Sequence, residues 1–114
     1  MTDVELTRAV ERGQMPNEGF HHLDHLRVAW VYLEESPTVD EAIARMAATL
    51  RRCAASVGKP EKYSDPLTAF WVYQMAAVRA MMPGTDCAAI VARYAWLLDK
   101  TLATRDTGSD PPHR

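Results

Sequence analysis

Residues 65–82 read DPLTAFWVYQMAAVRAMM, and this stretch decides the expected fold because its apolar residues would cover almost every face of a helix. The main polar interruptions are Thr68, Gln74 and Arg79. Asp65 is expected to be the N-cap and Pro66 the first helical residue, where the missing amide hydrogen costs nothing. A helix that is apolar on all sides is typical of a buried position. We therefore expect residues 67–82 to form the central helix of the protein.

The segments before this stretch are also helical in pattern, with apolar spacings of three and four residues and no strand-like alternation. Thr38 and Glu41 have the spacing of a capping box, in which each side chain satisfies a free backbone amide. They predict the start of a helix that Gly58 ends. Another helix is expected over about residues 21–35 and a short one over about residues 3–12.

After the central stretch, Thr85 is expected to cap a last helix with an apolar stripe from Ile90 to Leu102. Short connections favour antiparallel neighbours. The fold class is therefore predicted to be all-α, a compact bundle of four main helices preceded by a short N-terminal helix. A single domain is expected over residues 1–105, followed by a flexible tail over residues 106–114.

The composition is that of an ordinary globular protein, with 114 residues, 47% of them hydrophobic and 25% charged. A formal charge of -2 gives no general electrostatic attraction for nucleic acid or for an acidic membrane, so neither is an expected partner. The N-terminal residues do not have a signal-peptide pattern, and no apolar run would span a bilayer. We expect a cytoplasmic protein in which Cys53 and Cys87 are reduced thiols.

Three of the four histidines lie within residues 20–30, which read FHHLDHLRVAW. Helical spacing places His22 and His25 on the inward apolar face, whereas His21 lies at its edge. Two imidazoles three residues apart can converge on one metal ion or one substrate atom. They can also serve in acid-base chemistry, or they can be hydrogen-bonded polar groups at a helix end. The sequence leaves these three interpretations open.

A second polar segment begins the central helix, where residues 63–71 read YSDPLTAFW. If this helix is parallel to that of the histidines, their N-termini meet, and Asp65 approaches His22 and His25 as a catalytic group or as a third ligand of a divalent transition metal. The helix amides there could also receive an anion. The simpler interpretation makes Asp65 an N-cap and its neighbours turn residues. The side chains predicted to bind a ligand are Tyr63, Ser64, Thr68, Trp30 and Trp71.

These two segments resemble those of a group of small uncharacterised bacterial helical proteins, which have an F-x-H-x-x-H-L-x-x-A-W segment and a later Y-H-E-T-x-T segment. The resemblance covers roughly residues 18–100. The matching residues are Phe20, His22, His25, Leu26, Ala29, Trp30, Tyr63 and Thr68. The resemblance implies a site shared by both segments and no particular activity. Where the group has histidine, glutamate and threonine, this chain has Ser64, Asp65 and Pro66, so a third imidazole is absent.

Two functional hypotheses follow. The favoured hypothesis is a small enzyme that acts on a small molecule through metal-assisted or acid-base chemistry at His22, His25 and Asp65. The second is a domain without catalytic activity, in which the same end of the bundle is a ligand pocket or the surface of a homodimer. A basic group at the end of the helix over residues 39–57 is expected to be a solvated face, although it could hold an anionic ligand. Its members are Arg45, Arg51, Arg52, Lys59 and Lys62.

Overall fold

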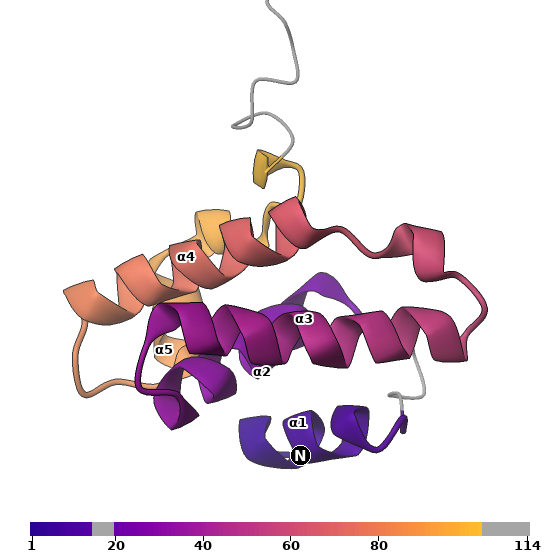
Figure 1. Ribbon diagram of the computed structural model, residues 1–114. Helices are drawn as coiled ribbons and strands as arrows, with labels where there is room; N and C mark the ends of the chain where they lie inside the picture. Colours follow the sequence, from indigo (N-terminus) through magenta and orange to yellow (C-terminus); the bar gives the residue numbers. More distant parts are fainter. Residues whose placement is uncertain (15–19, 104–114) are drawn as a thin grey trace, which may run out of the picture.

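The computed structural model describes residues 1–14 and 20–103, and every regular element within them is helical (Figure 1). This confirms the predicted all-α class. The elements are α1 (Asp3–Glu11), α2 (His22–Glu35), α3 (Val39–Ser56), the short 3-10 helix η1 (Pro60–Lys62), α4 (Asp65–Met81), α5 (Cys87–Arg93) and the 3-10 helix η2 (Ala95–Leu98). The predicted tail over residues 106–114, and most of the loop before α2, lie outside the described residues.

Threonine side chains begin two of the helices. Thr2 caps α1 through a reciprocal pair, in which its hydroxyl accepts from the amide of Glu5 at 3.0 Å and the Glu5 carboxylate accepts from the amide of Thr2 at 2.7 Å. Thr38 caps α3, as predicted, by accepting from the amide of Glu41 at 3.1 Å. These bonds satisfy amides that the helices themselves leave without a partner.

The central helix is α2, not α4, so this part of the sequence prediction is wrong. Helix α2 packs against α1, α3, α4 and α5, and its side chains from Val28 to Leu33 are all buried. In α4 the side chains of Leu67, Tyr73 and Met81 are 42%, 52% and 65% exposed. The physical reason is that the main contacts of α4 are with α2 and α3, whereas α2 also packs against α1 and α5, so part of the apolar surface of α4 remains exposed.

Two predicted caps fall one residue from their true positions. Helix α4 is capped by Ser64, whose hydroxyl accepts from the Leu67 amide at 3.3 Å, so Asp65 is its first helical residue. Helix α5 is capped by Asp86, not Thr85, through a bond of 2.8 Å from the Ala89 amide. Helix α5 also ends at Arg93, well before the predicted stripe ends, and the chain continues into η2. The described part of the chain therefore has three long helices.

The directions of the helices determine which of their ends lie together. Helix α3 runs opposite to α4, and α2 lies behind α3 in the view of Figure 1. The N-terminal ends of α2 and α4 lie at the same end of the molecule, as predicted. Near this end the ring centroids of His22 and Trp71 are 4.5 Å apart. None of the helices in the described ranges has the length and apolar character needed to cross a membrane.

Candidate functional site

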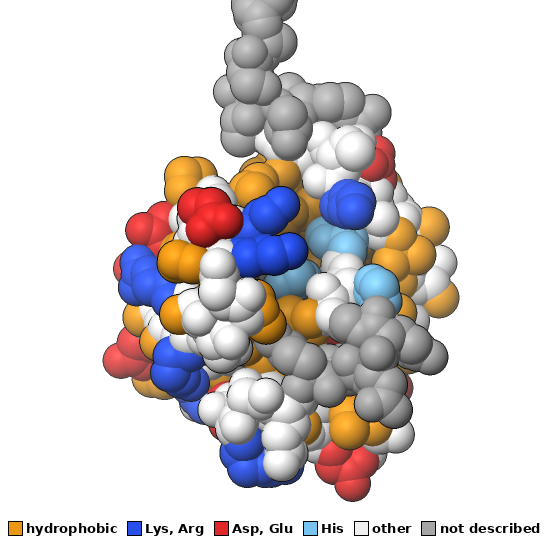
Figure 2. Space-filling model, turned by 90° about the vertical axis from the view of Figure 1, so that its right-hand side faces the viewer, with side chains coloured by type: hydrophobic (Ala, Val, Ile, Leu, Met, Phe, Trp, Pro, Cys, Tyr) orange, Lys and Arg blue, Asp and Glu red, His pale blue; other side chains and the backbone are white. Residues whose placement is uncertain are grey.

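A pocket of about 570 Å³ opens where the N-terminal ends of α2 and α4 meet the C-terminal half of α3. Its apolar lining comes mainly from α3 and α4, and the polar groups come from the starts of α2 and α4 and from two lysines. Figure 2 shows histidine side chains gathered on this face with Lys and Arg side chains beside them. The lining residues are Phe20, His21, His22, His25, Ala29, Met46, Leu50, Cys53, Ala54, Val57, Lys62, Tyr63, Ser64, Leu67, Thr68, Trp71, Val72 and Lys100.

His22 connects the pocket wall to η2. Its Nε2 lies 2.8 Å from the carbonyl oxygen of Leu97, and because a carbonyl oxygen only accepts, Nε2 is the donor. The ring also meets Trp71 edge-on, at an interplanar angle of 69°. The two contacts fix the orientation of the imidazole. His22 therefore belongs to the framework of the pocket as well as to its lining.

His25 lies deeper, with its ring centroid 4.2 Å from that of Phe20. Burial, with a smaller effect from the nearby imidazole of His22, lowers the pKa of His25 from 6.5 to about 4. The backbone of His21 and the carboxylate of Asp24 oppose this shift without cancelling it. His25 is therefore a neutral polar group at pH 7.

The polar side chains at the start of α4 are already hydrogen-bonded within the protein. The hydroxyl of Thr68 donates to the carbonyl oxygen of Ser64 at 2.9 Å, and Ser64 is occupied as the N-cap. The phenol of Tyr63 donates to Oδ1 of Asp65 at 2.6 Å, and burial raises the pKa of Tyr63. All three line the pocket, and their main hydrogen bonds stabilise the start of α4.

Asp65 is not part of the pocket lining. Its side chain is 64% exposed, and its Oδ1 accepts from the Arg51 guanidinium at 2.8 Å as well as from Tyr63. The predicted set of His22, His25 and Asp65 is therefore not brought together. Among the described residues, no group of three His, Cys, Asp or Glu side chains is arranged to hold a metal ion.

The two tryptophans predicted to bind a ligand lie in different places. Trp71 lines the pocket beside His22. Trp30 instead lines a second, smaller hollow of about 330 Å³ between α2 and the end of α4, where the guanidinium of Arg79 lies 5.5 Å from its ring centroid. Trp30 therefore does not contribute to the predicted site.

Several lining residues were not identified as site residues from the sequence. Leu50 and Cys53 lie at apolar helical spacing, which gives no sign of a gap in the packing. Lys62 was recognised only as part of a basic surface. Lys100 lies within the stretch expected to form the last helix, but the chain turns at η2 and brings Lys100 to the pocket.

Comparison of the chain with protein-family models, with curated proteins and with solved structures gives no match.

Proposed function

We propose that this protein binds a small molecule in the pocket between the starts of α2 and α4, without catalysing a reaction on it. The observation that carries the proposal is the pocket itself, a largely apolar hollow of about 570 Å³ whose lining also includes imidazole, hydroxyl and ammonium groups. This size and this division of polar and apolar surface are typical of small-molecule sites. The ligand is a small molecule rather than nucleic acid, since the chain has a net charge of -2.

Binding is favoured over acid-base catalysis by the state of the polar groups. His25, with a pKa of about 4, is a weak base at neutral pH, and a general base works best when its pKa is near the working pH. Burial also raises the pKa of the Cys53 thiol, which disfavours the reactive thiolate. Asp65 pairs with Arg51 outside the pocket. The neutral imidazole of His25 is better suited to orient a ligand by hydrogen bonding.

The proposal is tested with N-phenylnaphthylamine, an uncharged probe that fluoresces in apolar surroundings. Ala54 lines the pocket, and its neighbour Ala55 is exposed and does not. Ala54→Phe should fill the hollow and weaken probe binding by at least about tenfold, or about 1.4 kcal/mol. Ala55→Phe, which adds the same side chain outside the pocket, should bind like the original protein.

Probe-induced NMR shifts in the unaltered protein give a second measurement, which does not depend on the folding of either variant. The indole N–H of Trp71 should shift, and that of Trp96, which does not line the pocket, should not. Equal binding of the probe by Ala54→Phe and Ala55→Phe would contradict the proposed function. So would NMR shifts confined to the indole N–H of Trp96.

A further inference from the structure

The charged side chains that line the pocket are all of one sign. They are those of Lys62 and Lys100, and none of the described lining residues is Asp or Glu. Lys62 ends η1, and Lys100 follows η2, so the two ammonium groups come from segments far apart in the sequence. Neither forms an ion pair with a described residue. Pairing with the described residues therefore does not neutralise these two exposed lysines, which form the cationic rim of the pocket.

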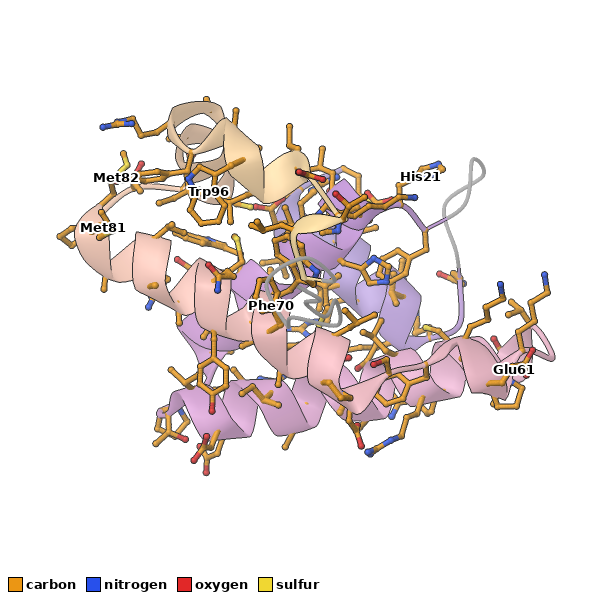
Figure 3. The ribbon with its side chains drawn as sticks, turned by 90° about the horizontal axis from the view of Figure 1, so that it is seen from above. His21, Glu61, Phe70, Met81, Met82 and Trp96 are labelled. Atoms are coloured by element: carbon orange, nitrogen blue, oxygen red, sulfur yellow. The ribbon has the colours of Figure 1, made fainter. Side chains whose placement is uncertain are left out.

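The carboxylates near the pocket in sequence lie outside its lining. Asp24 accepts from the amide of His21 at 3.0 Å and lies 3.9 Å from the Arg27 guanidinium, and Asp65 is held by Arg51. Glu61, in the middle of η1, lies well apart from His21 at the start of α2 (Figure 3). Asp99, beside Lys100, accepts from the amide of Thr101 at 3.0 Å and from its hydroxyl at 2.6 Å. None of these four acids is among the residues that line the pocket.

The N-termini of α2 and α4, helices of 14 and 17 residues, both lie at the pocket, and each has an acidic residue in its first turn, Asp24 in α2 and Asp65 in α4. These carboxylates offset the partial positive charge of the helix N-termini. The positive charge of the pocket therefore comes from its two lysines. The rest of the lining is largely apolar, with Met46, Leu50 and Trp71 among its members.

From this arrangement we infer that the ligand is an organic anion, with its charged group between Lys62 and Lys100 and its apolar body against the side chains of α3 and α4. The inference rests on the proposed function, because it names the chemical class of the ligand in the same pocket. Desolvated apolar surface would supply most of the affinity, and the unpaired lysines would supply the preference for negative charge.

A pair of probes with the same ring system separates these two contributions. Anilinonaphthalene sulfonate is N-phenylnaphthylamine with an added sulfonate. We expect the sulfonate to bind more tightly at low salt by about threefold to tenfold, which is the effect of one or two charges at a partly hydrated rim. The difference should shrink at high salt, because ions screen the rim charges.

Substitutions of single lysines test which side chains cause the tighter binding of the sulfonate. Lys62→Gln and Lys100→Gln should each weaken binding of the sulfonate by about threefold to tenfold and leave binding of the uncharged probe within about twofold. Lys59→Gln is the matched control, because Lys59 is an exposed lysine near Lys62 that does not line the pocket, and it should change neither affinity.

The outcomes distinguish the two proposals. If the uncharged probe binds in the pocket and the sulfonate binds no more tightly, or if Lys59→Gln has the effect of Lys62→Gln, the organic-anion inference is wrong and the pocket remains a binding site. If neither probe binds in a way that Ala54→Phe disrupts, the proposed function itself is wrong.

Discussion

At the scale of single residues, the surroundings of His25 keep its imidazole neutral. In the unfolded chain this group has a pKa near 6.5, and in the folded protein the value is about 4. Between these values the unfolded chain binds a proton that the folded protein excludes. The neutral side chain therefore contributes stability that is fully present above pH 6.5 and is lost as the pH falls toward 4.

The resulting prediction concerns the pH dependence of unfolding. Between about pH 6.5 and 4, His25 should lower the free energy of unfolding by up to about 3 kcal/mol, the equivalent of its pKa shift. His25→Gln removes the titrating group, so the free energy of the variant should fall less over this range. Urea denaturation of both proteins at several pH values measures the difference and cancels the contribution of the carboxylates. Parallel curves for the two proteins would contradict the prediction.

Residue spacing predicted the positions of two of the three candidate side chains. His22 and His25 lie on the inward face and line the pocket, because their positions follow from the apolar stripe of α2. Asp65 does not, because the cap of α4 is Ser64. Each helical residue turns the side-chain direction by about 100°, so a shift of one position carries the Asp65 carboxylate away from the pocket toward Arg51. Proline is accepted at either of the first two helical positions, so Pro66 did not determine which residue is the cap.

At the scale of elements, the start of α5 allows a test of a cap that was misplaced by one residue. The carboxylate of Asp86 accepts from the Ala89 amide at 2.8 Å. Asp86→Ala should therefore lower the free energy of unfolding by about 1 kcal/mol, the usual effect of losing an N-cap. Thr85→Ala is the matched control and should change it by less than about 0.5 kcal/mol. Urea denaturation at pH 7 measures both, and a larger loss for Thr85→Ala would show that the cap is Thr85 after all.

The lengths and burial of the elements were harder to predict than their type. The apolar spacing from Ile90 to Leu97 is compatible with one α-helix, but it is also compatible with a 3-10 turn, in which residues three apart again align. The amide of Leu97 donates to the carbonyl oxygen of Tyr94 at 2.9 Å, which is such a turn. Similarly, the apolar composition of α4 indicated burial, but composition does not show how many neighbours a helix has.

At the scale of the whole molecule, α2 joins the parts of the fold. It contacts α1 on one side and α3, α4 and α5 on the others, and its first turn forms part of the pocket. Its buried Tyr32 adds a polar connection, since the phenol donates to Glu11 at 2.6 Å and lies 2.7 Å from the hydroxyl of Thr49. Exposing α2 to solvent would therefore require most of the core to separate.

This position of α2 predicts the order of amide hydrogen exchange in the folded protein. Amides that open only on global unfolding exchange most slowly, whereas those of peripheral elements exchange through smaller openings. The amides of residues 28–33 should therefore report the free energy of global unfolding, and those of α1 and of α5, which has only seven residues, should open at lower free energies. Native-state exchange followed by NMR at increasing denaturant concentration measures these values residue by residue. Slower exchange in α4 than in residues 28–33 would show that α4 is the most protected helix, as its sequence first indicated.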